Sequence, residues 1–278
     1  MNPAFKNTKE HLNFFISHIP PILQHFNKSD LNSAQGFSTG MLQRLFYASN
    51  SINKLIYEHD EYIINDFSIG IIVRSILLDS LIGLNFYKIL KDNLHKSDKF
   101  LKIELNNFCN SVLSDGLRQT LDYYEQLKVE EVIKPEDLKN LYNVFSNKYN
   151  FFLEQSGGVG TKPNSKFKFF SKQKPPYKPI VSDAEMKGIA LKLQELYNIY
   201  SKYDHFGILY FEIDDTSFES KSNRISASIS LFVNHCTNLF DILQRVSIND
   251  NFVNSQYEIA NNYLQKKIEY NNNEVINS

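Results

Sequence analysis

Two charged residues inside the most apolar stretch of the chain are the first candidates for chemistry. Residues 67 to 87, FSIGIIVRSILLDSLIGLNFY, carry only Arg74 and Asp79 as charges. A guanidinium binds a phosphate through two parallel hydrogen bonds, so Arg74 is a candidate phosphate-binding residue, and Asp79 is a candidate ligand-binding residue beside it. The two charges lie about 140° apart around a helix, so each is expected to pair with a group from elsewhere in the fold. The alternative is that both form structural ion pairs that hold a helical bundle in register.

A second candidate group is the polar segment 200 to 207, YSKYDHFG, at the expected end of a helix. Its His205 would stand where the helix dipole favours the protonated imidazole, and a histidine can transfer protons near neutral pH. Ser201 and Lys202 would add ligand contacts beside it. The polar residues at helical spacing on this face are Gln194, Asn198, Ser201 and His205. This face either meets water or lines a groove, and the alternative role for His205 is that of a surface residue at a helix end before Gly207.

The segment 156 to 182 is irregular, basic and free of acidic residues. Its lysines include Lys166, Lys168 and Lys172, which alternate with aromatic residues. Lysines contact phosphates and aromatic rings stack on bases, so this pattern suits single-stranded nucleic acid. The alternative is that the loop folds back and covers the bundle with its lysine stems and rings.

No metal or cofactor signature is present in the sequence. Glu212, Asp214 and Asp215 lie in an expected loop but lack the spacing of a calcium-binding loop, so they are expected to be solvated. Cys109 and Cys236 are too far apart in sequence, and without neighbouring thiol or histidine ligands, to indicate a zinc site or a disulfide framework. We therefore expect neither a metal nor a cofactor.

Helical spacing of apolar residues dominates the chain and predicts an all-α protein with a single domain spanning residues 1–278. The irregular basic loop 156–182 lies within this domain, and residues 271–278 are expected to form a frayed tail. Helices are expected at 4 to 26, 36 to 58, 65 to 93, 97 to 128, 135 to 155, 183 to 206, 219 to 246 and 250 to 271.

Composition limits the location and the partners. The 278 residues are 42% hydrophobic and carry 30 basic against 31 acidic side chains, so no overall field favours nucleic acid or an anionic membrane. The amino-terminal residues lack the pattern of a signal peptide. The run 67 to 87 is long enough to span a bilayer, but its charges and polar residues favour a buried helix of a soluble protein. We therefore expect a cytoplasmic protein that does not enter a membrane.

The order of these motifs resembles that of HEPN-like bacterial helical proteins over residues 35 to 245. The pieces that carry the resemblance are Arg74 with Asp79, the basic and proline-rich stretch 172 to 179, Glu185 with Met186, and Tyr200-Ser201 with His205. The resemblance implies a HEPN-like helical bundle, self-association as a homodimer, and a role in stress or phage defence through RNA.

Ribonucleases of that superfamily use an arginine followed four to six residues later by a histidine on one helix, without metal. This chain departs from that pattern, because no arginine has a histidine at that spacing. A ribonuclease would therefore need Arg74 and His205 to rebuild the pair from two helices, with His205 moving the ribose hydroxyl proton and Arg74 stabilising the phosphate charge. The rival hypothesis is a non-catalytic helical protein-interaction module whose buried ion pairs are purely structural.

Overall fold

The computed structural model describes residues 3–27, 31–57, 66–154, 162–165, 178–201 and 217–276. The chain divides into two compact units, one formed by Met1–Asp92 with Pro176–Ser278 and the other by Asn93–Pro175. The single domain expected from the sequence stays a prediction, and the described helices form two separate packed sets. The second unit is thus an insertion between two segments that together form the first.

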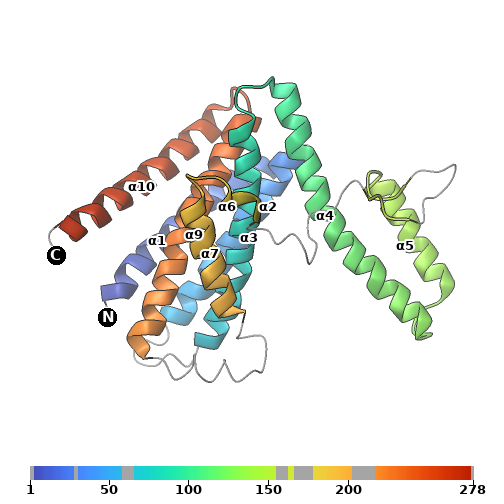
Figure 1. The fold of residues 1–278 in the computed structure, drawn as a ribbon, viewed down its shortest axis with the longest axis horizontal. Helices are drawn as coiled ribbons and strands as arrows, with labels where there is room; N and C mark the ends of the chain where they lie inside the picture. The colour runs from blue at the N-terminus through green and yellow to red at the C-terminus, as the bar shows by residue number, and fades with distance from the viewer. Residues whose placement is uncertain are drawn as a thin grey trace. The chain divides into compact units, whose positions relative to one another are not determined.

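The prediction of an all-α protein is confirmed for the described residues, in which the only pairing of extended backbone is an isolated bridge between Leu153 and Pro163. The helices of the first unit, in chain order, are α1 (Pro3–Phe26), α2 (Ser33–Tyr57), α3 (Asp66–Asp92), α6 (Lys178–Val181), α7 (Lys187–Tyr200), α9 (Phe218–Val246) and α10 (Asn251–Ile276) (Figure 1).

Helix α3 is a core helix of the first unit, as expected for a helix that is apolar on nearly every side. It packs against α2, α7 and α9, which lie beside it in Figure 1. Side chains on several of its faces, such as Val73, Leu77 and Phe86, are fully buried. Such a helix can keep a charge only where a neighbouring helix or solvent receives it.

The same helix is long and apolar enough, over Phe67–Asp92, to cross a membrane. In the structure 61% of its most apolar window is buried inside the protein. That burial is consistent with the core helix of a soluble protein, as the sequence analysis expected, although one such helix is weak grounds for or against a membrane. The cytoplasmic location stays a prediction.

One very close contact in this core joins α9 to α3. A Cβ atom built on Gly83 would lie 2.6 Å from Cε1 and 2.7 Å from Nδ1 of His235, so the imidazole ring rests directly on the backbone of α3. His235 is only 3% exposed, and neither of its ring nitrogens has a hydrogen-bond partner in the described part of the chain. Burial lowers the pKa of His235 to about 3, so the ring is neutral at physiological pH.

The second unit contains α4 (Asp98–Val129) and α5 (Pro135–Lys148). The side chain of Ser97 accepts a hydrogen bond from the backbone N–H of Phe100 and caps α4. A small apolar core joins the two helices to the chain that follows them. Its buried members are Leu117, Leu121, Leu138, Phe145, Phe152 and Leu153.

Several predicted helix ends are wrong. Helix α5 ends at Lys148 instead of 155, because the chain turns back at Tyr149 and places Phe152 and Leu153 in the small core. Helix α7 begins at Lys187 instead of 183. The end of the expected irregular loop forms the short helix α6, and α10 continues to Ile276, into the segment expected as a tail.

Candidate functional site

Arg74 lies between α3 and α7, where it meets an aromatic ring. Its guanidinium carbon Cζ is 5.6 Å from the centroid of the Tyr197 ring, and the side chain is half-buried. A guanidinium over a tyrosine face is stabilised by about 0.5–2 kcal/mol. Arg74 therefore points toward the carboxyl-terminal half of α7. Its ring partner, Tyr197, precedes the start of the polar segment at Tyr200 by three residues. Apart from Tyr200 and Ser201, the polar segment 200 to 207 lies outside the described residues, so its expected pairing with Arg74 stays a prediction.

Asp79 forms its ion pair with a residue of α2, whereas Arg74 faces α7. Its Oδ2 accepts a hydrogen bond of 2.6 Å from Nε of Arg44, and Nη2 of the same guanidinium donates to Oγ of Ser75 at 3.1 Å. The structure thus agrees with the expectation that Arg74 and Asp79 pair with different partners. Burial raises the pKa of Asp79, and the hydrogen bond and charge of Arg44 oppose that rise. This pairing favours a structural role for Asp79 over the predicted ligand-binding role.

The polar face of α7 is exposed and hydrogen-bonded to itself. Nε2 of Gln194 donates to Oδ1 of Asn198 at 2.7 Å, and Oγ of Ser201 donates to the backbone oxygen of Asn198 at 2.7 Å. Ser201 follows Tyr197 by one helical turn, so both lie on one side of α7. That is the side which Arg74 approaches.

The other predicted site residues lie outside the described residues. They are His205 and Lys202, which follow α7, and Lys166, Lys168 and Lys172 of the basic loop. The pairing of Arg74 with His205 and the role of the loop therefore stay predictions. The acids Glu212, Asp214 and Asp215 lie outside the described residues as well. Within the part of the chain that the structure describes, no group of three or more histidine, cysteine or acidic side chains could hold a metal ion.

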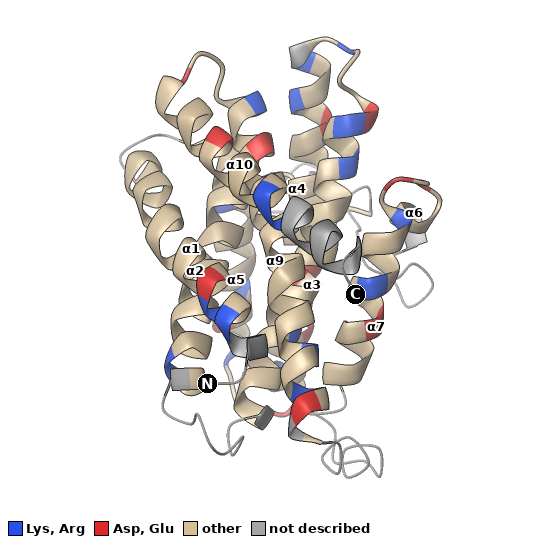
Figure 2. Ribbon diagram, turned by 90° about the vertical axis from the view of Figure 1, so that its left-hand side faces the viewer, with Lys and Arg blue, Asp and Glu red and all other residues tan. Residues whose placement is uncertain are grey.

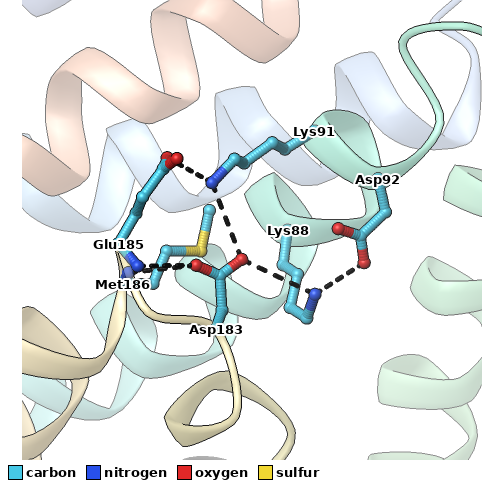
Figure 3. A network of polar contacts seen from close by, with 6 residues as sticks. All are labelled: Lys88, Lys91, Asp92, Asp183, Glu185 and Met186. Carbon is cyan, nitrogen blue, oxygen red and sulfur yellow. Dashed lines mark hydrogen bonds and ion pairs between the residues drawn. The ribbon is translucent and has the colours of Figure 1, made fainter.

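A network of charges fixes the start of α7 against the end of α3 (Figure 3). The ammonium groups of Lys88 and Lys91 each lie 3.7 Å from Oδ2 of Asp183. Lys88 also pairs with Asp92 at 2.6 Å, and Lys91 pairs with Glu185. Five side chains from two segments that are far apart in sequence thus form one alternating chain of charge.

Asp183 also accepts hydrogen bonds from the backbone at the start of α7. Its Oδ1 accepts hydrogen bonds from the backbone N–H groups of Glu185 at 3.0 Å and Met186 at 3.2 Å, which closes the turn that leads into α7. Desolvation acts to raise the pKa of Asp183, but these N–H groups and the two lysines together hold it below its usual value. The network therefore sets the position along α3 at which α7 begins. Lys88 and Lys91 lie more than 90 positions before Asp183, so no local sequence pattern relates these partners.

A hollow of about 490 Å³ lies on the other flank of α7, between this helix and the start of α9. Two basic residues, Lys192 and Arg224, and two acidic residues, Glu195 and Glu219, line it. Neither Arg74 nor Ser201 is among its lining residues. Sequence reasoning missed this hollow, because its basic residues are separated by 32 positions and share no motif.

No family model, no curated protein and no solved structure matches the chain.

Proposed function

We propose that this chain binds a phosphate-bearing ligand, RNA above all, where Arg74 of α3 meets the end of α7. The observation that supports the proposal most is the placement of the guanidinium over the Tyr197 ring, 5.6 Å from its centroid. The contact holds the guanidinium carbon close to the ring, and the N–H groups of a guanidinium are the donors that bind phosphate. A tyrosine beside an arginine also offers a stacking surface for a base.

The resemblance to HEPN-like proteins supports RNA as the ligand. Arg74, Ser201, Lys202 and His205 would line the binding groove, and the lysines 166, 168 and 172 would contact further phosphates. In the sharper form of the proposal the protein is a metal-independent ribonuclease of stress or phage defence that acts as a homodimer. His205 would then accept the ribose 2′-hydroxyl proton while Arg74 stabilises charge on the phosphate.

Fluorescence anisotropy with a labelled single-stranded RNA tests the binding. We expect Arg74→Met to weaken binding by about 10- to 100-fold, which corresponds to one charge-assisted contact, and to lower the salt dependence by about one phosphate contact. Arg44→Met is the matched control, because it removes an arginine from the neighbouring α2–α3 ion pair and leaves Arg74 in place. Equal RNA affinity of the wild type and Arg74→Met, or no binding by the wild type at low salt, would refute the proposal.

Cleavage is tested separately with the same RNA in the presence of a metal chelator. The ribonuclease form predicts products with the wild type and none with His205→Ala or Arg74→Met. Binding without cleavage by the wild type would remove the catalytic form and keep RNA binding.

A second candidate function is a non-catalytic helical module for protein interaction. The observation that favours it is that Asp79 and the Lys88–Lys91–Asp183 network are satisfied inside the first unit. In that case Arg74→Met would lower the melting temperature and leave RNA affinity unchanged.

A further inference from the structure

A second cavity in the first unit, of about 320 Å³, lies between α1, α7, α9 and α10. Its size is at the lower end of small-molecule sites, which are about 300–1,000 Å³. Two lysines stand at it from different helices, Lys192 on α7 and Lys267 on α10. The apolar part of the lining comes from Leu231 and Val233 of α9 and Leu264 of α10. The cavity thus combines two cations with an apolar wall.

The most buried polar residue of the lining is His11 of α1, which is only 5% exposed. Its Nδ1 lies 2.8 Å from the hydroxyl of Tyr263. Burial, followed by the nearby charge of Lys267, lowers the pKa of His11 to about 4, and burial raises the pKa of Tyr263. The histidine is therefore neutral and the tyrosine keeps its proton at physiological pH.

These protonation states determine what the imidazole offers to the cavity. If the tyrosine hydroxyl donates its proton to Nδ1, the neutral ring carries its own proton on Nε2. That arrangement uses the donor of Tyr263 and leaves an N–H donor on the other nitrogen of His11. Lining side chains of Asn7, Ser230 and Asn234 add further hydrogen-bonding groups.

Both lysines are held by exposed acids. Lys267 pairs with Glu10, whose side chain is 44% exposed, and its ammonium lies 5.7 Å from the Tyr263 ring centroid. Lys192 pairs with Glu195 at 3.0 Å, and both of these side chains are about half exposed. Acidic and basic residues occur together on α7 and α10 (Figure 2). Exposed ion pairs are weak, so an anion that enters the cavity can replace these carboxylates.

We propose that this cavity binds a small organic oxyanion, a molecule with an apolar body and one carboxylate or phosphate group. The oxyanion lies between the ammonium groups of Lys192 and Lys267, and the N–H of His11 donates to it. The apolar body lies against Leu231, Val233 and Leu264. This site uses none of the residues of the proposed RNA site and does not depend on that proposal.

Isothermal titration calorimetry with four probes tests the chemistry. Benzoate and phenyl phosphate carry both an apolar ring and an oxyanion, inorganic phosphate carries only the anion, and benzyl alcohol carries only the ring. We expect benzoate or phenyl phosphate to bind at least tenfold more tightly than either single-feature probe. Whichever of the two binds more tightly identifies the head group. Equal affinity for benzoate, phenyl phosphate and benzyl alcohol would overturn the proposal, as would no binding of either aromatic oxyanion at millimolar concentration.

Variants test the assigned residues in opposite directions. Lys267→Met and Lys192→Met should each weaken binding of the tighter aromatic oxyanion at least fivefold. Glu10→Gln should strengthen it two- to fivefold, because it removes the carboxylate that competes for Lys267. Lys187→Met is the matched control, since this exposed lysine of α7 is outside the cavity and should leave affinity unchanged.

A second measurement uses the wild-type protein, so its result does not depend on whether the variants fold. In the wild-type protein, addition of the bound probe should shift the NMR signal of the His11 ring. Unchanged affinity in both lysine variants, or an unshifted His11 signal under saturating probe, would exclude this cavity as the binding site.

Discussion

Arg74 and Asp79 show that two charges in one apolar helix can be accommodated in different ways. Asp79 is bound to Arg44 at 2.6 Å inside the α2–α3 contact, whereas Arg74 lies over the Tyr197 ring on the α7 side. A buried carboxylate needs an opposite charge, because its pKa otherwise rises until it becomes neutral. The half-buried guanidinium of Arg74 is stabilised in part by the aromatic face of Tyr197. Of the two, Arg74 is the residue whose surroundings suit a ligand.

Sequence reasoning predicted the separation of these two charges but not their partners. The angular offset along a helix follows from the spacing of five residues and needs no tertiary information. Arg44 and Tyr197 stand 35 positions before Asp79 and 123 positions after Arg74. No local pattern relates residues so far apart, so only the packing of α2 and α7 on α3 could reveal these pairs.

Gly83 provides a test at the same scale. We expect Gly83→Ala to lower the free energy of unfolding by about 1–2 kcal/mol, because overpacking a buried site costs about 1–3 kcal/mol and alanine recovers at most about 1 kcal/mol of helix propensity. The new Cβ would lie 2.6 Å from the ring of His235, which is enclosed and cannot move aside. Urea denaturation followed by circular dichroism measures the change.

The matched control is Gly40→Ala in α2, where an added Cβ has nothing within 4 Å. It should stabilise the protein by about 0.5–1 kcal/mol. If Gly83→Ala costs less stability in the His235→Ala background than in the wild type, the two changes are coupled and the clash is confirmed. Stabilisation by Gly83→Ala would contradict the prediction and show that the His235 ring can move away from α3.

At the scale of elements, α7 depends on Asp183 for both its first turn and its attachment to α3. Asp183→Ala removes the acceptor of two backbone N–H groups and the partner of two lysines. We expect the melting temperature to fall by a few degrees, as for loss of a helix cap in a protein of this size. Thermal denaturation followed by circular dichroism measures it.

Two further variants separate the contributions. Asp183→Asn keeps an acceptor for the N–H groups and loses the charge, so it should fall between the wild type and Asp183→Ala. Glu185→Gln removes only an exposed ion-pair partner of Lys91 and should change the melting temperature by less than about one degree. An equal loss for all three would mean that the charges, and not the cap, hold α7 in place.

Helices were predictable as elements, whereas several of their ends were not. Long amphipathic periodicity identified α1, α2, α3, α4, α9 and α10 within a few residues. The apolar pattern continued through Phe151, Phe152 and Leu153, and so it extended α5 too far. These residues are apolar because they enter a core after the chain reverses, and periodicity cannot distinguish that from a continued helix. Helix α6 was missed because Pro179 and the prolines before it are typical of a loop.

At the scale of the whole molecule, the insertion of Asn93–Pro175 between two parts of the first unit explains why the sequence suggested one domain. A composition change or a polar linker is the usual sign of a boundary. The junction at Pro175 lies in the irregular basic stretch 156 to 182, which the sequence pattern predicts as a loop within one domain, and the junction at Asn93 has no long polar linker. The ion pairs of Lys88 and Lys91 with Asp183 hold the two segments of the first unit together close to the point where the chain leaves and re-enters it.

Two buried histidines make the stability of the first unit sensitive to acid. The pKa of His11 is lowered to about 4 and that of His235 to about 3, both mainly by burial, from an ordinary value of 6.5. The unfolded chain therefore binds more protons than the folded one between pH 6.5 and the folded values, so stability falls as pH falls through this range. The pKa of Asp79 is raised by burial, so its effect on stability has the opposite sign.

We expect each of these histidines to reduce the free energy of unfolding by about 2 kcal/mol between pH 7.5 and pH 5, since one pKa unit corresponds to about 1.4 kcal/mol. Urea denaturation at a series of pH values measures the slope. His235→Gln should flatten the slope even though it also lowers stability through packing, because the substituted side chain does not titrate. His95→Gln, at an exposed position, should leave the slope as it is in the wild type. A wild-type slope close to zero between pH 6.5 and pH 5 would contradict the burial of both neutral rings, because burial alone requires the folded protein to resist their protonation.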